Sequence, residues 1–324
     1  MFDQSLAVRA MTVAASIAAV SLLIFGWPWR SPNRSRLILG WTLGLGVSFS
    51  VGCYVLDGKF HWPLKGLQVV EDAESKDRLL FLLLPAAMLV EGLSALLRIP
   101  RLIIWLLRLV IAGGVAPIIL HNSIYLENLP GSDGPEWNAQ QQWQILSLLG
   151  GSLFLVWLTL DLFVRKVPSR AVPLAMSIVS VGSAVTIMFS ANLSGGQLAL
   201  PLAGALAGGF LASFLLPISR DGGGLLGISL VVLFGLLVEN RFFAKLTTLH
   251  AALLFFSLLL YWLSEIPPAR RLSPRNRGLL RVLLLAIPIT FVVAQARAKF
   301  EEESKTPSSQ PGEPTLDDYK NFGD

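Results

Sequence analysis

The chain has 324 residues, of which 53% are hydrophobic and only 15% are charged, with a net charge of +5. Charged residues make up about a quarter of a typical soluble protein, so this composition indicates membrane-spanning segments. The positive charge would suit nucleic acid, but the basic residues lie in short links beside apolar runs, where charge sets membrane topology. We therefore expect a lipid bilayer around the chain and no nucleic-acid partner.

The apolar runs are long enough to cross a bilayer as helices. Crossing about 30 Å of hydrocarbon takes roughly 17 to 25 helical residues, and alternating strand patterns are absent. The predicted fold class is all-α, a polytopic integral membrane helical bundle of about ten transmembrane helices. The predicted segments are 7–27, 37–56, 79–97, 102–121, 143–164, 171–191, 198–217, 224–239, 246–264 and 279–296.

The basic residues predict how these segments are oriented. When the links between segments are taken alternately, one set holds fourteen Lys and Arg residues and the other holds six. Because cytoplasmic links carry the basic excess, the richer set is placed in the cytoplasm and both chain termini outside it. The predicted location is the cell inner membrane. The richer set is Arg30, Arg34, Arg36, Arg98, Arg101, Arg165, Lys166, Arg170, Arg220, Arg270, Arg271, Arg275, Arg277 and Arg281.

Two charges lie inside the hairpin of the third and fourth segments. Glu91 lies seven residues before Arg98, and Arg108 lies seven residues after Arg101. Both are therefore about 10 Å from the turn at a rise of 1.5 Å per residue. Because an isolated charge at mid-bilayer costs at least about 2.5 kcal/mol, each charge needs a partner or a water-filled cavity. Two interpretations remain open: an ion pair that holds the hairpin in register, or a proton or cation site.

Other polar residues near the segments have both a local and a functional interpretation. Asp161 lies four residues before Arg165, which is the spacing of a local ion pair on a helix. His121 and His250 lie at the outer ends of the fourth and ninth segments, where interfacial polar residues are expected. The alternative is a small outward-facing polar site that joins them. The candidate intramembrane polar site therefore consists of Glu91, Arg108, His121 and His250.

Small residues recur every four positions in two segments. Such a face lets two helix backbones approach closely, which favours helix association in lipid. We expect close packing at both faces, and the alternative is a flexible or thinly walled passage. The residues are Gly40, Gly44, Ser48 and Gly52 in the second segment, and Gly204, Gly208 and Ala212 in the seventh.

The composition changes after the last segment. Residues 1–297 form the predicted integral membrane domain, and residues 298–324, rich in Glu, Ser and Pro, form a predicted disordered polar tail. Tyr319 and Phe322 are candidate anchors of a docking peptide in this tail, and a solvated terminus is the alternative. Before the fifth segment, Asp133 is the expected helix cap, and that helix is expected to begin outside the bilayer.

The sequence carries no signature of an enzyme class. It contains no HExxH, GxSxG or Walker A pattern, and its three histidines lack metal-ligand spacing. The one cysteine, Cys53, lies inside an apolar segment, so neither an intramolecular disulfide nor a cysteine metal cage is available. We therefore predict no catalytic residue, no metal and no cofactor.

Three functions remain compatible with these features. A non-catalytic subunit or scaffold of a membrane complex, bound to other subunits through its tail, is favoured because most segments carry no buried charge. A small-solute transporter would use Glu91 and Arg108. A lipid-handling enzyme would need His61, Asp133 and Glu136 to converge outside the membrane.

The predicted orientation is testable by cysteine labelling. In a variant without Cys53, single cysteines at Ser132 and Ser309 should react with a membrane-impermeant maleimide on intact cells. A cysteine at Ser273 should react only after the membrane is permeabilised, because its link belongs to the basic set. Labelling of Ser273 from outside would reverse the assignment of sides.

Overall fold

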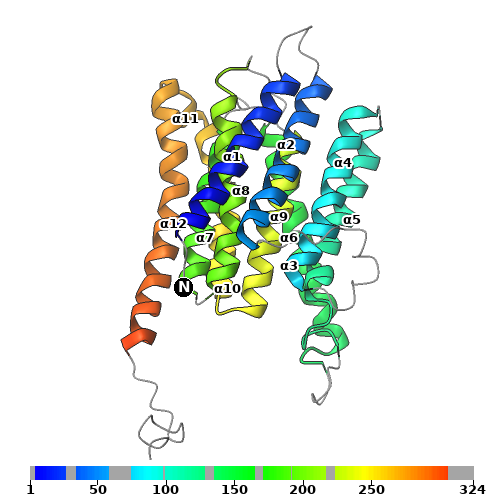
Figure 1. Cartoon of the computed structure of the whole chain (residues 1–324), viewed down its shortest axis with the longest axis vertical. Helices are drawn as coiled ribbons and strands as arrows, with labels where there is room; N and C mark the ends of the chain where they lie inside the picture. Colours follow the sequence, from blue (N-terminus) through cyan, green and yellow to red (C-terminus); the bar gives the residue numbers. More distant parts are fainter. Residues whose placement is uncertain are drawn as a thin grey trace, which may run out of the picture.

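The computed structural model describes residues 4–26, 34–57, 74–97, 99–127, 135–164, 171–190, 192–216 and 223–305. This part of the chain is 88% helical and contains no strand. Ten helical segments in it are long and apolar enough to cross a membrane. The predicted all-α helical bundle is thereby confirmed (Figure 1).

The ten spans follow the predicted order along the chain. Two of them include a short segment of different helical pitch. In one span, η2 connects α3 to α4, and in another, η3 follows α10. The elements are α1 (Gln4–Gly26), α2 (Arg34–Asp57), α3 (Ser75–Arg78), η2 (Leu79–Leu83), α4 (Leu84–Leu96), α5 (Arg101–Leu120), α6 (Ala139–Val164), α7 (Ala171–Phe189), α8 (Leu193–Ala212), α9 (Gly223–Phe243), α10 (Thr248–Leu260), η3 (Tyr261–Glu265), α11 (Pro267–Arg270) and α12 (Pro274–Lys305).

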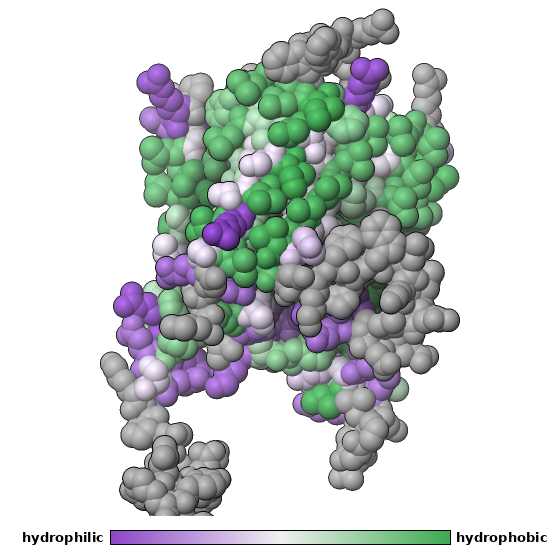
Figure 2. All heavy atoms as spheres, viewed as in Figure 1, coloured by the Kyte–Doolittle hydropathy of each residue, from purple (hydrophilic) through white to green (hydrophobic). Residues whose placement is uncertain are grey.

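The helices run roughly along one axis, and α9 lies at the centre. Figure 1 places the start of α1 and the end of α12 at the same end of the bundle, as an even number of crossings requires. In α9, 83% of the spanning window is buried, against 22% in α1. The central helix packs against α2, α4, α5, α6, α7, α8 and α10. Figure 2 shows a broad hydrophobic band, with hydrophilic residues gathered mostly toward the two ends.

The small-residue faces pack against α1, as close packing predicts. A Cβ atom at Gly204 would lie 2.5 Å from the backbone oxygen of Met11, and one at Gly208 would overlap the carbonyl of Ala15. On the other side of α1, a Cβ at Gly44 would lie 3.2 Å from Cβ of Ser21. Helix α1 is therefore held between α2 and α8 by direct backbone approach.

The wide turn η2 has an identifiable cause in the sequence. Pro85 follows it closely and has no backbone N–H, so one of the regular i to i−4 hydrogen bonds of this span cannot form. A π-type turn of five residues, Leu79–Leu83, stands at that place. The span continues through it as one helix into α4.

Helix α6 begins outside the apolar stretch as predicted, but its N-terminal cap is Asn138. The Oδ1 atom of Asn138 accepts from the N–H of Gln141 at 2.8 Å, and Oε1 of Gln141 accepts from the N–H of Asn138 at 3.1 Å. This reciprocal pair is a capping box with Asn and Gln. The expected cap, Asp133, lies outside the described residues.

The last helix is longer than predicted. Disorder was expected from residue 298, whereas α12 continues to Lys305. Ion pairs on the protruding turns support it: Arg297 contacts Glu301 at 2.7 Å, and Glu303 is approached by Lys299 at 3.9 Å and by Lys245 at 3.1 Å. Pairs of opposite charge at helical spacing stabilise a solvated helix. The rest of the tail, with Tyr319 and Phe322, lies outside the described residues.

The backbone contact of Gly208 predicts a large effect of one methyl group. Gly208→Ala should lower the thermal stability of the purified protein, because overpacking costs about 1 to 3 kcal/mol and the obstacle here is backbone. The matched control is Gly151→Ala, where a Cβ would meet nothing within 4 Å. That change should be neutral or stabilising by up to about 1 kcal/mol, because Ala is the better helix former. Equal melting temperatures for the two variants would contradict the packing described for α1.

Candidate functional site

A buried cluster of charges joins three helices of the bundle. Arg108 on α5 donates from Nε to Oε1 of Glu91 on α4, and from Nη2 to Oε2 of the same carboxylate, both at 2.9 Å. Its third nitrogen, Nη1, donates to Oδ1 of Asp161 on α6 at 3.2 Å. Of the two interpretations of the hairpin charges, the ion pair is therefore present, and a second carboxylate completes it.

All three side chains are withdrawn from solvent. Glu91 has 0% of its surface exposed, Arg108 has 5% and Asp161 has 7%. A two-pronged arginine–carboxylate contact is among the strongest hydrogen-bonded pairs in proteins, and here every terminal nitrogen of the guanidinium faces a carboxylate oxygen. Burying a charge costs desolvation free energy, which only well-formed pairing can offset. The contacts of Arg108 provide that pairing.

Two tryptophans enclose the guanidinium. The Cζ atom of Arg108 lies 4.8 Å from the ring centroid of Trp105 and 5.3 Å from that of Trp157. Trp157 is itself fully buried. An aromatic face attracts a cation and excludes water from it, so the two rings add both attraction and insulation to the ion pairs.

The central helix covers the carboxylate of Glu91. A Cβ atom at Gly227 of α9 would lie 2.5 Å from Oε1 of Glu91 and 2.6 Å from Cζ2 of Trp157. Only glycine lets the α9 backbone come this close. Gly227 ends the run GGGLLG at 222–227, whose GxGxxG spacing also occurs in dinucleotide-binding turns. Here the described part of that run opens a spanning helix, so the spacing carries no such meaning.

Asp161 has a partner on another helix that its sequence spacing to Arg165 did not indicate. Its described ion pair is with Arg108 of another helix, and Arg165 lies outside the described residues. Asp161 follows Trp157 by four residues, so both share the inward face of α6. Helical spacing to an inward-facing aromatic residue was the signal in the sequence that could have placed Asp161 in the cluster.

The structure places His121 at the open end of the hairpin, far from Arg108. The two residues are thirteen positions apart on α5 and its cap, or about 20 Å along the helix axis. The backbone oxygen of His121 accepts a hydrogen bond from Arg78, and its ring Nε2 lies 3.5 Å from Oε1 of Glu127. His121 therefore belongs to the end of the bundle and not to the buried cluster.

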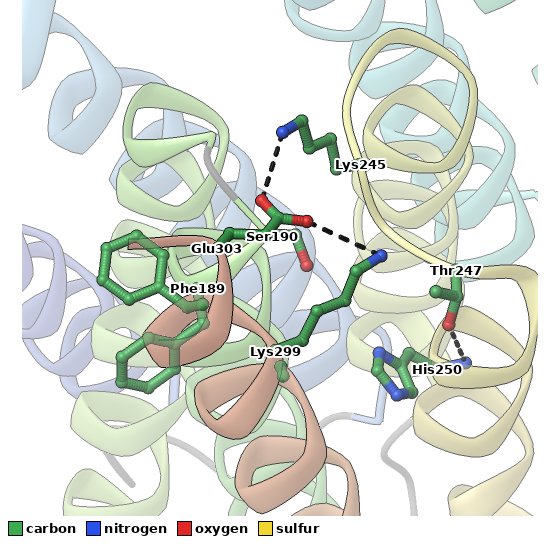
Figure 3. A pocket seen from close by; sticks show the side chains of 9 residues that line it. Phe189, Ser190, Lys245, Thr247, His250, Lys299 and Glu303 are labelled. Carbon is green, nitrogen blue, oxygen red and sulfur yellow. Dashed lines mark hydrogen bonds and ion pairs between the residues drawn. The ribbon is translucent and has the colours of Figure 1, made fainter. Parts of the chain in front are cut away.

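His250 lies in a separate group between α10 and α12. Its ring Nε2 is 3.1 Å from Oε1 of Gln295, and its backbone N–H donates to Oγ1 of Thr247. Figure 3 shows it beside a small cavity where Lys245 and Lys299 both point to Glu303. The cavity measures about 10 Å³, which is room for a single water molecule. The two histidines thus bond to different neighbours, and only Glu91 and Arg108 of the four candidate residues meet.

A second buried arginine lies in the span predicted last. Arg281 of α12 was counted among the cytoplasmic link residues, but its Nη2 lies 2.6 Å from Oε1 of Glu265 and its Nε donates to Oγ of Ser264 at 3.0 Å. Arg281 also stacks on Tyr261, whose hydroxyl donates to the carbonyl of Ala171 at 2.9 Å. This contact ties α12 to η3 and α7. Sequence reasoning missed it because Arg281 was assigned to the link before the last span and not to the helix itself.

The described residues contain no group of three or more His, Cys, Asp or Glu side chains that could hold a metal ion. Comparison of the chain with family models, with curated proteins and with solved structures finds no match. The architecture itself defines the class of protein: a multi-pass helical membrane protein, with buried ion pairs between its helices.

The shared role of Arg108 predicts an order of effects. Arg108→Gln should destabilise the protein by about 3 to 5 kcal/mol, because it leaves Glu91 buried without its partner and weakens Asp161. Glu91→Gln should cost less, because Arg108 keeps Asp161. Thermal unfolding in detergent measures both, with Glu127→Gln as a control at a half-exposed carboxylate. An effect of Glu91→Gln as large as that of Arg108→Gln would contradict the three-residue cluster.

Proposed function

We propose that this protein is a non-catalytic subunit or scaffold of a membrane complex in the cell inner membrane. The observation that carries the proposal is that the charged groups of the buried cluster pair with one another and are withdrawn from solvent. Both oxygens of Glu91 are bonded to Arg108, and its exposed fraction is 0%. A solute site must exchange its ligand with water, whereas these groups already satisfy one another. Their chemistry suits fixed helix positions better than transport.

The way the cluster is shared supports a structural role. It connects α4, α5 and α6 and is covered by α9, so it defines how the hairpin stands against the centre of the bundle. A buried ionic group of this kind sets register more than it adds stability. A rigid bundle with a tail that binds other subunits is what a scaffold requires.

A small-solute transporter remains the second candidate, and one observation favours it. A cavity of about 120 Å³ lies among the ends of α2, α8 and α9, at the end of the bundle predicted to be outside. Ser75 donates to Oε1 of Glu239 there at 2.7 Å, while the buried Oε2 has no hydrogen-bond partner among the described residues. A polar cavity of this size holds water, so Glu239 rather than Glu91 is the carboxylate that a solute would meet first.

The lipid-handling enzyme has less support. Two of its three residues, His61 and Asp133, lie outside the described residues. The third, Glu136, is exposed, and its backbone N–H donates to the carbonyl of Ile124 at 2.7 Å. We therefore propose no catalytic role for it.

Removal of the C-terminal tail distinguishes a scaffold from a transporter, because only the scaffold needs the tail. Because α12 continues to Lys305, the informative cut is after that residue, which leaves the ion pairs of Glu303 intact. The truncated protein should insert and melt like the full chain but lose the membrane proteins that co-purify with it. A full-length Tyr319→Ala/Phe322→Ala variant should lose the same set, because aromatic anchors dominate such contacts.

Two results, if both are found, would contradict the scaffold proposal. The first is that the truncated chain retains every partner of the full chain. The second is that Glu91→Gln or Glu239→Gln abolishes uptake of a solute into reconstituted vesicles. In that case the helices, and not the tail, hold the working site.

A further inference from the structure

A wide groove lies between α5 and α6. It has a volume of about 630 Å³, within the 300 to 1,000 Å³ range of small-molecule sites. Its lining is mostly apolar. The residues are Leu109, Gly113 and Pro117 from α5, Leu126 and Glu127 from the following turn, and Gln142, Trp143, Leu146, Ser147, Gly150 and Gly151 from α6.

Glycines both close the floor of this groove and hollow its walls. A Cβ atom at Gly150 would lie 3.0 Å from Cα of Gly113, so the two helix backbones touch there. A Cβ at Gly113 or Gly151 would meet nothing within 4 Å, and both residues are exposed. The groove therefore has a backbone floor and opens sideways, toward the surroundings of the bundle.

The length of the groove matches one leaflet of a bilayer. On α6 its lining runs from Gln142 to Gly151, and on α5 from Leu109 to Pro117. At a rise of 1.5 Å per residue these stretches measure about 12 to 14 Å. The hydrocarbon of a bilayer is about 30 Å thick, so the groove covers about half of it. A groove of this length accommodates the hydrocarbon part of a lipid from one leaflet.

The polarity of the groove changes along its length in the way an amphiphile requires. Glu127 and Gln142 stand at the end where α6 begins, and Trp143 beside them is 76% exposed. Tryptophan at this level is typical of the interface between headgroups and hydrocarbon. Toward the middle of the membrane the lining is Leu109, Leu146 and three glycines, with Ser147 as its one polar side chain.

From this geometry we infer that the groove is a binding site for one phospholipid. One acyl chain lies along the glycine floor, and the headgroup rests at the level of Glu127 and Gln142. The bound lipid belongs to the leaflet next to the α5–α6 connection, and its presence does not require the scaffold role proposed above.

Native mass spectrometry of the full chain tests this assignment. The protein is purified in detergent, supplied with palmitoyl-oleoyl phosphatidylethanolamine, and washed with lipid-free detergent. The wild type should retain one phospholipid. Gly113→Leu and Gly151→Leu, on opposite walls, should each lose it, because every methylene excluded from the groove costs a several-fold loss of affinity.

The chain offers a matched control for these variants. Gly278→Leu introduces the same side chain at a glycine of α12 that is also open, with nothing within 4 Å of its Cβ, and it should retain the lipid. Thermal unfolding of each variant shows whether it is folded. A phospholipid with a photoreactive diazirine in its acyl chain adds a test on the unchanged protein, in which labelled peptides should come from both α5 and α6.

Three outcomes would overturn the assignment of a lipid to this groove. They are that the wild type retains no lipid, that the groove variants retain as much lipid as Gly278→Leu, or that labelling spreads evenly over the lipid-facing helices. A complex with the mass of two chains that the groove variants disrupt would show that a second copy occupies this face instead.

Discussion

The cost of holding a charge in hydrocarbon governs the interior of this protein. Arg108 offsets that cost by contacting two carboxylates at once, Glu91 at 2.9 Å and Asp161 at 3.2 Å. Because its guanidinium is planar and forked, the positions of α4 and α6 around α5 are set together. Trp157 and the α9 backbone at Gly227 then fit around the completed cluster. The same device recurs where Arg281 meets Glu265.

Glycine serves two opposite purposes in this bundle. At Gly204, Gly208 and Gly227 the missing side chain allows contact, because backbone or a carboxylate occupies the space. At Gly113 and Gly151 the missing side chain leaves open space, and a groove results. The residue type alone does not distinguish these cases. The distinction comes from what the neighbouring helix places opposite each position.

The spans were predictable because hydrocarbon imposes a minimum length and a minimum hydropathy on each helix taken alone. The Glu91–Arg108 pair was predictable too, since a short hairpin brings equal depths together. The end of α12 was not predicted, because its polar turns look like a disordered tail unless the ion pairs of Glu303 are seen. The Asn138 cap was overlooked, although its spacing to Gln141 was visible in the sequence.

By itself, the sequence determined the class of protein and about ten spans, and it placed Glu91 and Arg108 at equal depth with an ion pair as one of two interpretations. These features depend on local hydropathy and on neighbouring helices of a hairpin. Only the tertiary structure decided that Asp161 joins Arg108, that α9 closes over Glu91, and that His121 and His250 lie apart. It alone placed the groove between α5 and α6. These features arise between helices distant in the chain, whose relative rotation and depth are set by packing across the whole bundle.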